Sequence, residues 1–145
     1  MDTSETYIKM CEKAKEVQAS RVIANGDFEV RFKHKRGQVE VHHHREITAH
    51  YCPEDHIWLP RQDQLQEIYG RCAADEMGLR DISHSIIMAS FLAFSVWLNE
   101  RYEEAPYVCN PTNAFDSGEQ LWLAFVMKEK YGKVWDGENW EKFNG

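Results

Sequence analysis

The stretch FEVRFKHKRGQVEVHHHREI, residues 28–47, decides the fold class of this 145-residue chain. Apolar and charged residues alternate from Phe28 to Lys33, which is typical of a half-buried β-strand. Lys35-Arg36-Gly37 predicts a turn, and the alternation resumes from Val39 to Ile47. We therefore expect a β-hairpin that has Glu29 and Arg31 on its outward face.

Two further elements flank the hairpin. Helical periodicity predicts an N-terminal helix from Asp2 to Ser20, with Asp2 or Thr3 as its cap. One apolar stripe on this helix comprises Tyr7, Ile8, Cys11, Ala14 and Val17. After the hairpin, Ile57-Trp58-Leu59 is a short apolar run suited to a third strand, and Pro60 ends it.

Three helices are predicted in the second half of the chain. The first spans Gln62 to Met77, and Gly70 inside it predicts an irregular middle. The second begins at Asp81 or Ser83 and ends near Glu104. The third follows Asp116-Ser117, which resembles a capping box with Glu119 and Gln120, and ends at Tyr131 before Gly132.

Apolar residues predict the core of the helical part. Between Ile86 and Leu98 they lie almost all round the second helix, a pattern typical of a buried helix, so we expect it at the centre. The residues expected to be largely buried are Leu65, Ile68, Ile87, Phe91, Phe94, Leu98, Leu121 and Phe125.

The chain ends in a predicted mini-hairpin. Asp136-Gly137 lies between Trp135 and Trp140, and this dipeptide favours a type I′ turn with positive φ at the glycine. Strands early and helices late give an α+β fold, and no linker or repeat divides residues 1–145, so we expect one domain.

Composition excludes several classes of protein. With 43% hydrophobic and 12% aromatic residues, the chain is too apolar to be disordered. Its net charge of -7 argues against general nucleic-acid affinity. No membrane span and no secretion signal are expected, because the longest apolar stretch is too short and the N-terminus lacks a basic start. We therefore expect a cytoplasmic protein with free thiols.

Three stretches together resemble a known group of sequences. They are TYIKMCEKAKEVQ at 6–18, IWLPRQDQLQEIYG at 57–70 and EQLWLAFVMKEKYGKVWDGENW at 119–140. These stretches resemble small uncharacterised proteins of bacteriophages and prophages, mostly from Firmicutes. The resemblance implies a phage or prophage origin and expression in the cytoplasm of a bacterial host, and it implies no activity, cofactor or catalytic residue.

A histidine-rich segment is a candidate metal site. His42 and His44 share one face of the predicted strand, and Cys52 and His56 follow on a loop, so the four side chains would suit zinc. The spacing matches no closed zinc motif, and the same residues equally fit ordinary hairpin positions around a small buried cysteine. Zinc is therefore one alternative, and no cofactor is the other.

Two further groups are candidate partner-binding residues. Arg31, Lys33, Lys35 and Arg36 make the hairpin basic, which suits phosphate backbone or an acidic protein, and also suits plain solvation. The tail residues Trp135 and Trp140 would either cover the helical core or anchor a partner.

No nucleophile elbow, phosphate-binding loop, dinucleotide fingerprint or metalloprotease motif occurs in the sequence. We expect a phage or prophage accessory protein that binds a host or phage macromolecule without catalysis, and we expect this macromolecule to be a protein. The alternative is a metal-dependent or nucleic-acid-processing protein that uses the histidine and cysteine cluster at residues 42–56.

Overall fold

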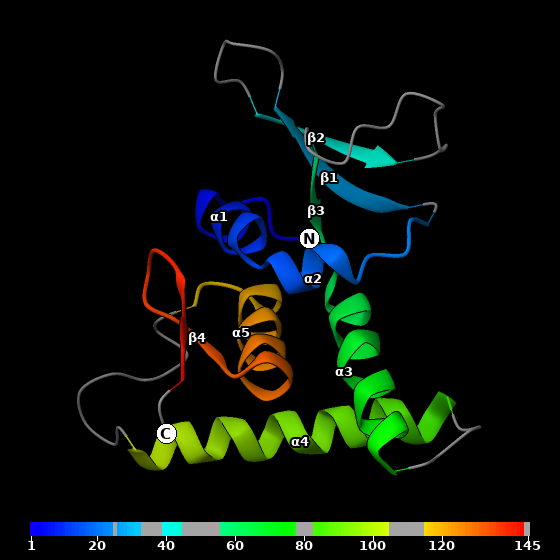
Figure 1. Ribbon diagram of the computed structural model, residues 1–145, viewed down its shortest axis with the longest axis vertical. Coiled ribbons are helices and arrows are strands. Elements are labelled where there is room, and N and C mark those ends of the chain that lie inside the picture. The colour runs from blue at the N-terminus through cyan, green and yellow to red at the C-terminus, as the bar shows by residue number, and fades with distance from the viewer. Residues whose placement is uncertain (25, 33–38, 45–55, 78–82, 105–114, 144–145) are drawn as a thin grey trace.

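The structure is a computed structural model that describes residues 1–24, 26–32, 39–44, 56–77, 83–104 and 115–143 (Figure 1). The described helices and small antiparallel sheets follow the predicted order, so the α+β class is confirmed. The helices are α1 (Glu5–Lys13), α2 (Lys15–Ala19), α3 (Gln62–Met77), α4 (Ser83–Glu104) and α5 (Gly118–Tyr131). The strands are β1 (Asp27–Phe32), β2 (Val39–His44), β3 (His56–Leu59), β4 (Lys133–Trp135) and β5 (Trp140–Lys142).

The elements are arranged along one long axis. The sheet of β1, β2 and β3 lies at one end of that axis, and α4 runs across the other end (Figure 1). Between these ends lie α1, α2, α3 and α5, with the β4–β5 hairpin beside α5 (Figure 1). Buried side chains from α1, α2, β1, β3, α3, α4, α5 and β5 belong to one hydrophobic cluster.

The three-stranded sheet confirms the predicted hairpin and third strand. Its order is β2-β1-β3 with both pairs antiparallel, so β1 is the central strand. Val30 on β1 is fully buried and pairs with Val41 on one side and Ile57 on the other. The predicted turn at residues 35–37 and the predicted end of the second strand at residues 45–47 lie outside the described residues.

The predicted outward position of Glu29 is wrong. The Glu29 residue is only 2% exposed to solvent, because Arg21 and His56 pack against its carboxylate. Period-two alternation therefore identified the strand correctly, but charged side chains cover the face that it assigned to solvent.

The predicted N-terminal helix is two helices. Ser4, and neither Asp2 nor Thr3, is the cap: its hydroxyl accepts a hydrogen bond from the Tyr7 N–H at 3.2 Å. The helix breaks at Ala14, where ψ is 66°. The Gln18 amide donates to the Cys11 carbonyl at 3.1 Å across this break.

Gln18 also ties the break to the sheet. Its side-chain oxygen accepts from the Trp58 N–H at 3.0 Å, and its side-chain nitrogen donates to the Trp58 carbonyl at 2.9 Å. The amide side chain thus pairs with β3 as a neighbouring strand would. The predicted apolar stripe is confirmed, since Tyr7, Cys11, Ala14 and Val17 are fully buried and Ile8 is half-buried.

The junction between β3 and α3 is anchored in the hydrophobic core by its apolar residues. Trp58, Leu59 and Leu65 are buried, and the Tyr7 hydroxyl donates to the Pro60 carbonyl. The predicted irregularity at Gly70 is wrong, because α3 continues through this residue without a break.

Helix α5 is the central helix of the protein. Ser117 caps its start by accepting from the Gln120 N–H at 3.1 Å, and Gly132 ends it with a φ of 62°, as predicted. Six consecutive residues, 122–127, are buried, so α5 is covered on every side.

The prediction that α4 is the central helix is wrong. One face of α4 packs on α3 and α5 through Ser90, Phe94 and Trp97. Ile87 and Phe91, both predicted to be buried, are 48% and 42% exposed, and Phe91 lies at the margin of the packed face, where its ring contacts Trp122 edge-on. Of the other predicted core residues, Leu65 and Phe125 are fully buried, and Ile68, Phe94, Leu98 and Leu121 are partly buried against the cluster.

The predicted terminal hairpin is present with a different turn. Trp135 pairs with Trp140, so the loop between β4 and β5 has four residues instead of the two of a type I′ turn. The Asp136 carboxylate accepts from the N–H groups of Glu138 and Asn139, which stabilises the longer loop. Gly137 has a φ of 106°, as predicted, a conformation that suits a residue without a Cβ.

Candidate functional site

The predicted basic hairpin is described only in part. Arg31 lies on β1, where the backbone register pairs it with Glu40 of β2 and His56 of β3. Lys33, Lys35 and Arg36 lie outside the described residues. Binding by this group therefore stays a prediction.

The strand register places three of the four predicted metal-binding residues opposite residues of β1. His42 pairs with Glu29 and His44 with Asp27, while His56 pairs with Arg31. Directly opposed residues of an antiparallel pair lie on one face of a sheet, so these register positions share the face of Asp27 and Glu29. Cys52 lies outside the described residues.

A buried cluster of charged side chains lies on this same face. Arg21 follows α2, and its guanidinium lies 3.1 Å from the Glu29 carboxylate and 3.4 Å from that of Asp27. His56 Nδ1 lies 3.0 Å from the second oxygen of Glu29. Gln64 of α3 donates to the Asp27 carboxylate at 2.6 Å. The side chains of Arg21, Asp27, Glu29 and His56 are almost completely buried.

This cluster joins distant segments of the chain. Arg21 pairs with both carboxylates, and both oxygens of Asp27 accept further hydrogen bonds, which lowers the free-energy cost of burying these groups. Asp27 also accepts from the Ala24 N–H at 3.0 Å, so it fixes the connection from α2 into β1. Because its carboxylates are already paired and enclosed, the cluster acts as a clamp between α2, the sheet and α3.

Within the part of the chain that the structure describes, no group of three or more His, Cys, Asp or Glu residues is placed to hold a metal ion. Cys11 is a buried free thiol, and burial raises its pKa, so it stays protonated and packs as a small apolar group.

The two tail tryptophans hold the terminal hairpin on the N-terminal helix. Trp140 is 9% exposed, and its indole N–H donates to the Met10 carbonyl at 3.0 Å. Trp135 is half-buried beside it, with the two ring centroids 5.0 Å apart. This packing matches the covering role that the sequence offered as one of two alternatives.

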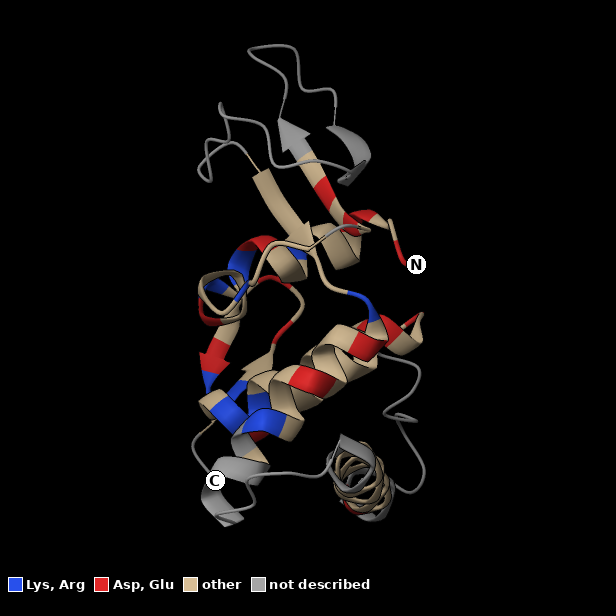
Figure 2. Cartoon of the chain, turned by 90° about the vertical axis from the view of Figure 1, so that its right-hand side faces the viewer, with Lys and Arg blue, Asp and Glu red and all other residues tan. Residues whose placement is uncertain are grey.

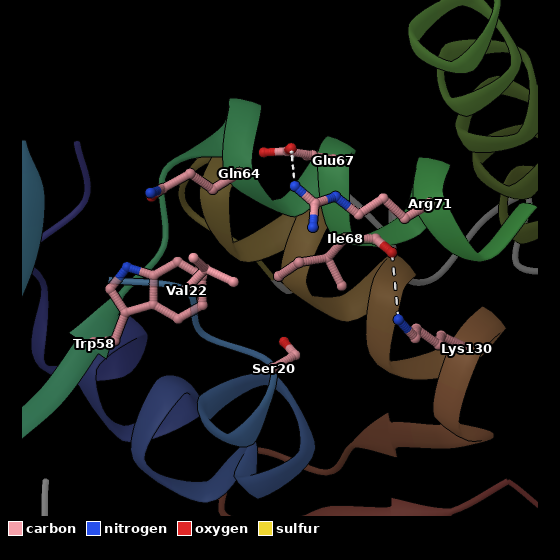
Figure 3. A pocket seen from close by; sticks show the side chains of 8 residues that line it. All are labelled: Ser20, Val22, Trp58, Gln64, Glu67, Ile68, Arg71 and Lys130. Carbon is pink, nitrogen blue, oxygen red and sulfur yellow. Dashed lines mark hydrogen bonds and ion pairs between the residues drawn. The ribbon is translucent and has the colours of Figure 1, made fainter. Parts of the chain in front are cut away.

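A small cavity opens between α3, β3 and the chain after α2 (Figure 3). Its volume is about 260 Å³, and Trp58, Ile68 and Val22 form its apolar walls. The charged groups at its rim have partners: Arg71 pairs with Glu67, and Lys130 donates to the Ile68 carbonyl at 3.4 Å (Figure 3). Ligand cavities usually measure about 300 to 1,000 Å³, so this one is small for an organic ligand.

The outward face of α4 is the largest apolar feature on the described surface. Its exposed side chains are Ile87 at 48%, Met88 at 61%, Phe91 at 42%, Leu92 at 65% and Val96 at 56%. From Ser83 to Asn99 the helix has no Lys, Arg, Asp or Glu. Viewed along its axis, α4 lies at the edge of the molecule and is almost free of charged residues (Figure 2).

These side chains form two parallel rows on the helix. Ile87 and Phe91 make one row and Met88, Leu92 and Val96 the other, each at a spacing of four residues, which places side chains on one face. An open hollow of about 440 Å³ adjoins Phe91 and is also lined by Met1 and Gln66. We call the five exposed residues the α4 outer face.

Sequence reasoning missed both the buried charge cluster and the α4 outer face. Arg21, Asp27 and Glu29 lie close together in the sequence, but no local pattern indicates that the arginine pairs with both carboxylates. For α4 the sequence did contain an indication, since a helix with apolar residues on all sides needs other apolar residues packed against it. The sequence does not say whether the cover comes from the same chain.

None of the described helices is long and apolar enough to cross a membrane. No family model matches this chain, and no curated protein or solved structure was found to be similar to it. Within the described ranges, fold and surface define an α+β protein that exposes an apolar face of α4.

Proposed function

We propose that this chain is a phage or prophage accessory protein that acts in the host cytoplasm by binding a protein, and not by catalysis. The observation that carries the proposal is the α4 outer face, five adjoining apolar side chains on a helix whose other face is well packed. The resemblance of three stretches to phage and prophage proteins supports the origin.

An exposed apolar face of this size is a feature of association surfaces. Single apolar residues are common on protein surfaces, but contiguous patches mark sites where another surface binds. At roughly 200 Å² for a large side chain, the exposed fractions give on the order of 500 Å² for the α4 outer face. This area lies at the upper end for a monomer, whose largest patch is about 300 to 600 Å² and often functional.

The basic hairpin is a second contact region under this proposal. Arg31, Lys33, Lys35 and Arg36 would serve an acidic protein partner in preference to nucleic acid, because the chain as a whole carries a net charge of -7.

Site-specific photo-crosslinking in bacterial cells tests the proposal. A photoreactive amino acid replaces Leu92 on the α4 outer face or, as a matched control, Val22, which is 70% exposed and lies outside α4. We expect discrete protein adducts from position 92 and none from position 22. Equal yields at the two positions would contradict the proposal.

A metal-dependent or nucleic-acid-processing role is the second candidate, and the sheet register favours it. The register sets His42 and His44 opposite Glu29 and Asp27, on the sheet face that also holds His56. Metal analysis of protein purified without an affinity tag tests this role. About one zinc per chain would support it, and less than about 0.2 zinc per chain would exclude a metal-dependent role.

A further inference from the structure

We infer that the partner of the α4 outer face is a second copy of this chain, so that two α4 helices pack across a two-fold axis near Leu92. This inference rests on the proposed function, because it names the protein that the face binds. Three observations carry it: the length of uncharged helix, the arrangement of the two rows, and the area.

The lack of charged residues on this part of α4 indicates the chemistry of its partner. From Ser83 to Asn99 the described helix offers no ionised carboxylate, ammonium or guanidinium group with which to recognise a charged surface. A face of this kind is matched by another uncharged apolar ridge, and each copy of this chain carries one. The net charge of -7 makes two copies repel elsewhere, so they meet most favourably where the charge is lowest.

The two rows fit each other when the helices are related by a two-fold axis. Rows at a spacing of four residues form ridges with a groove between them, and such ridges interdigitate when two helices cross at about -50°. The face extends from Ile87 to Val96, so its centre lies at Phe91 and Leu92. A two-fold axis there sets the Ile87 end of one copy against the Val96 end of the other, and two-fold interfaces are the most frequent in protein oligomers.

The area suits a weak but specific dimer. Two faces of about 500 Å² would remove about 1,000 Å² from solvent, which is the lower limit for a specific interface. The position of α4 leaves room for this contact, because it lies across the end of the long axis opposite the three-stranded sheet (Figure 1). The two three-stranded sheets, one from each copy, would therefore lie at opposite ends of the dimer.

Sedimentation equilibrium of the purified chain tests the inference. Over about 1 to 100 μM protein we expect a monomer–dimer equilibrium with a dissociation constant in the micromolar range. Leu92→Lys should raise this constant at least about 100-fold, because the axis brings two lysines together in an apolar contact. Val22→Lys makes the same chemical change at an exposed position outside α4 and should leave the constant unchanged.

Two further samples keep the test independent of folding defects. Met88→Lys changes a second exposed residue of the face and should also give monomers. An equal mixture of Leu92→Lys and Leu92→Glu should dimerise again, since opposite charges then meet at the axis. A mixture that stays monomeric would contradict the position of the axis.

The outcomes separate this inference from the proposed function. A wild-type chain that is monomeric at every concentration, together with crosslinks from position 92 to a different protein, would overturn the dimer and keep the binding function. Crosslinks from position 92 to the chain itself would support both. A monomeric chain without position-specific crosslinks would overturn both.

Discussion

Helices α4 and α5 are both apolar, and the protein uses them in opposite ways. Residues 122–127 of α5 are all buried, under α1, α3, α4 and the terminal hairpin. On α4, Phe94 and Trp97 pack inward while Met88, Leu92 and Val96 face outward. The difference shows that apolar residues all round a helix indicate how much cover it needs, but not which molecule supplies it.

The aromatic contact between the two helices explains why α4 stays attached by one face. The Phe94 ring stacks on Trp122 with centroids 4.2 Å apart and an angle of 12° between the planes. Phe125 packs edge-on against Phe94, Trp97 and Trp122. Each such aromatic pair adds about 0.5 to 1.5 kcal/mol to the free energy of burial, so these contacts hold the inner face of α4 on α5, and Phe91 at the margin of the outer face adds an edge-on contact with Trp122.

Truncation inside α5 should have the largest effect on stability. Phe125→Ala removes a fully buried ring and leaves a cavity among four aromatic neighbours, so we expect the free energy of unfolding to fall by about 4 kcal/mol. Urea denaturation at low protein concentration measures it. A loss below about 1 kcal/mol would show that α5 is not the centre of the core.

Loss of the hairpin cover over α5 should have the next largest effect. Trp140→Ala removes a buried indole and its hydrogen bond to the Met10 carbonyl, which should lower the free energy of unfolding by about 3 kcal/mol. Trp135→Ala, at a half-buried position, should cost less. Melting temperatures unchanged within a degree for both variants would instead favour the tail as a partner anchor.

The two faces of α4 should respond differently to the same substitution. Phe94→Ala removes the ring stacked on Trp122 and should cost about 2 kcal/mol, since the side chain is only partly buried. Leu92→Ala, on the outer face, should stay within about 0.5 kcal/mol at low protein concentration. Urea denaturation of both variants gives the comparison, and equal losses would contradict the two-faced description of α4.

Acid should weaken the start of α5 by a small amount. Burial acts to raise the pKa of Asp2, but hydrogen bonds from Ser117, Ser4 and Gln120 lower it more, and the net pKa lies below its ordinary value. A carboxyl with a lower pKa in the folded state stabilises the fold above its unfolded pKa, and that contribution is lost as the pH falls below about 4.

The melting temperature of Asp2→Asn should therefore fall less than that of the wild type between neutral pH and pH 3. Glu12→Gln changes an exposed carboxyl of α1 and is the matched control. An acid response of Asp2→Asn equal to that of the wild type would show that Asp2 contributes nothing to the start of α5.

Features encoded by neighbouring residues could be predicted from the sequence. The caps at Ser117 and Gly132, the three strands and the positive φ of Gly137 all depend on residues a few positions apart. The break at Ala14 could not be predicted, because Gln18 stabilises it by pairing with Trp58, 40 residues away.

The same distinction applies to the candidate site. Burial of Glu29 depends on Arg21 and His56, which come from different elements, so alternation on one strand could not reveal it. The α4 outer face was hidden for a related reason: its residues have the composition of a core, and only the packing of α3 and α5 on one side shows that the other side is uncovered.

The most direct test of the central claim, that a second copy covers the α4 outer face, is the concentration dependence of the melting temperature. Folded subunits that associate stabilise each other by mass action, so the wild-type melting temperature should rise by several degrees between about 1 and 100 μM protein. Leu92→Lys should melt at one temperature throughout this range. A wild-type melting temperature that is constant and equal to that of Leu92→Lys would contradict the claim.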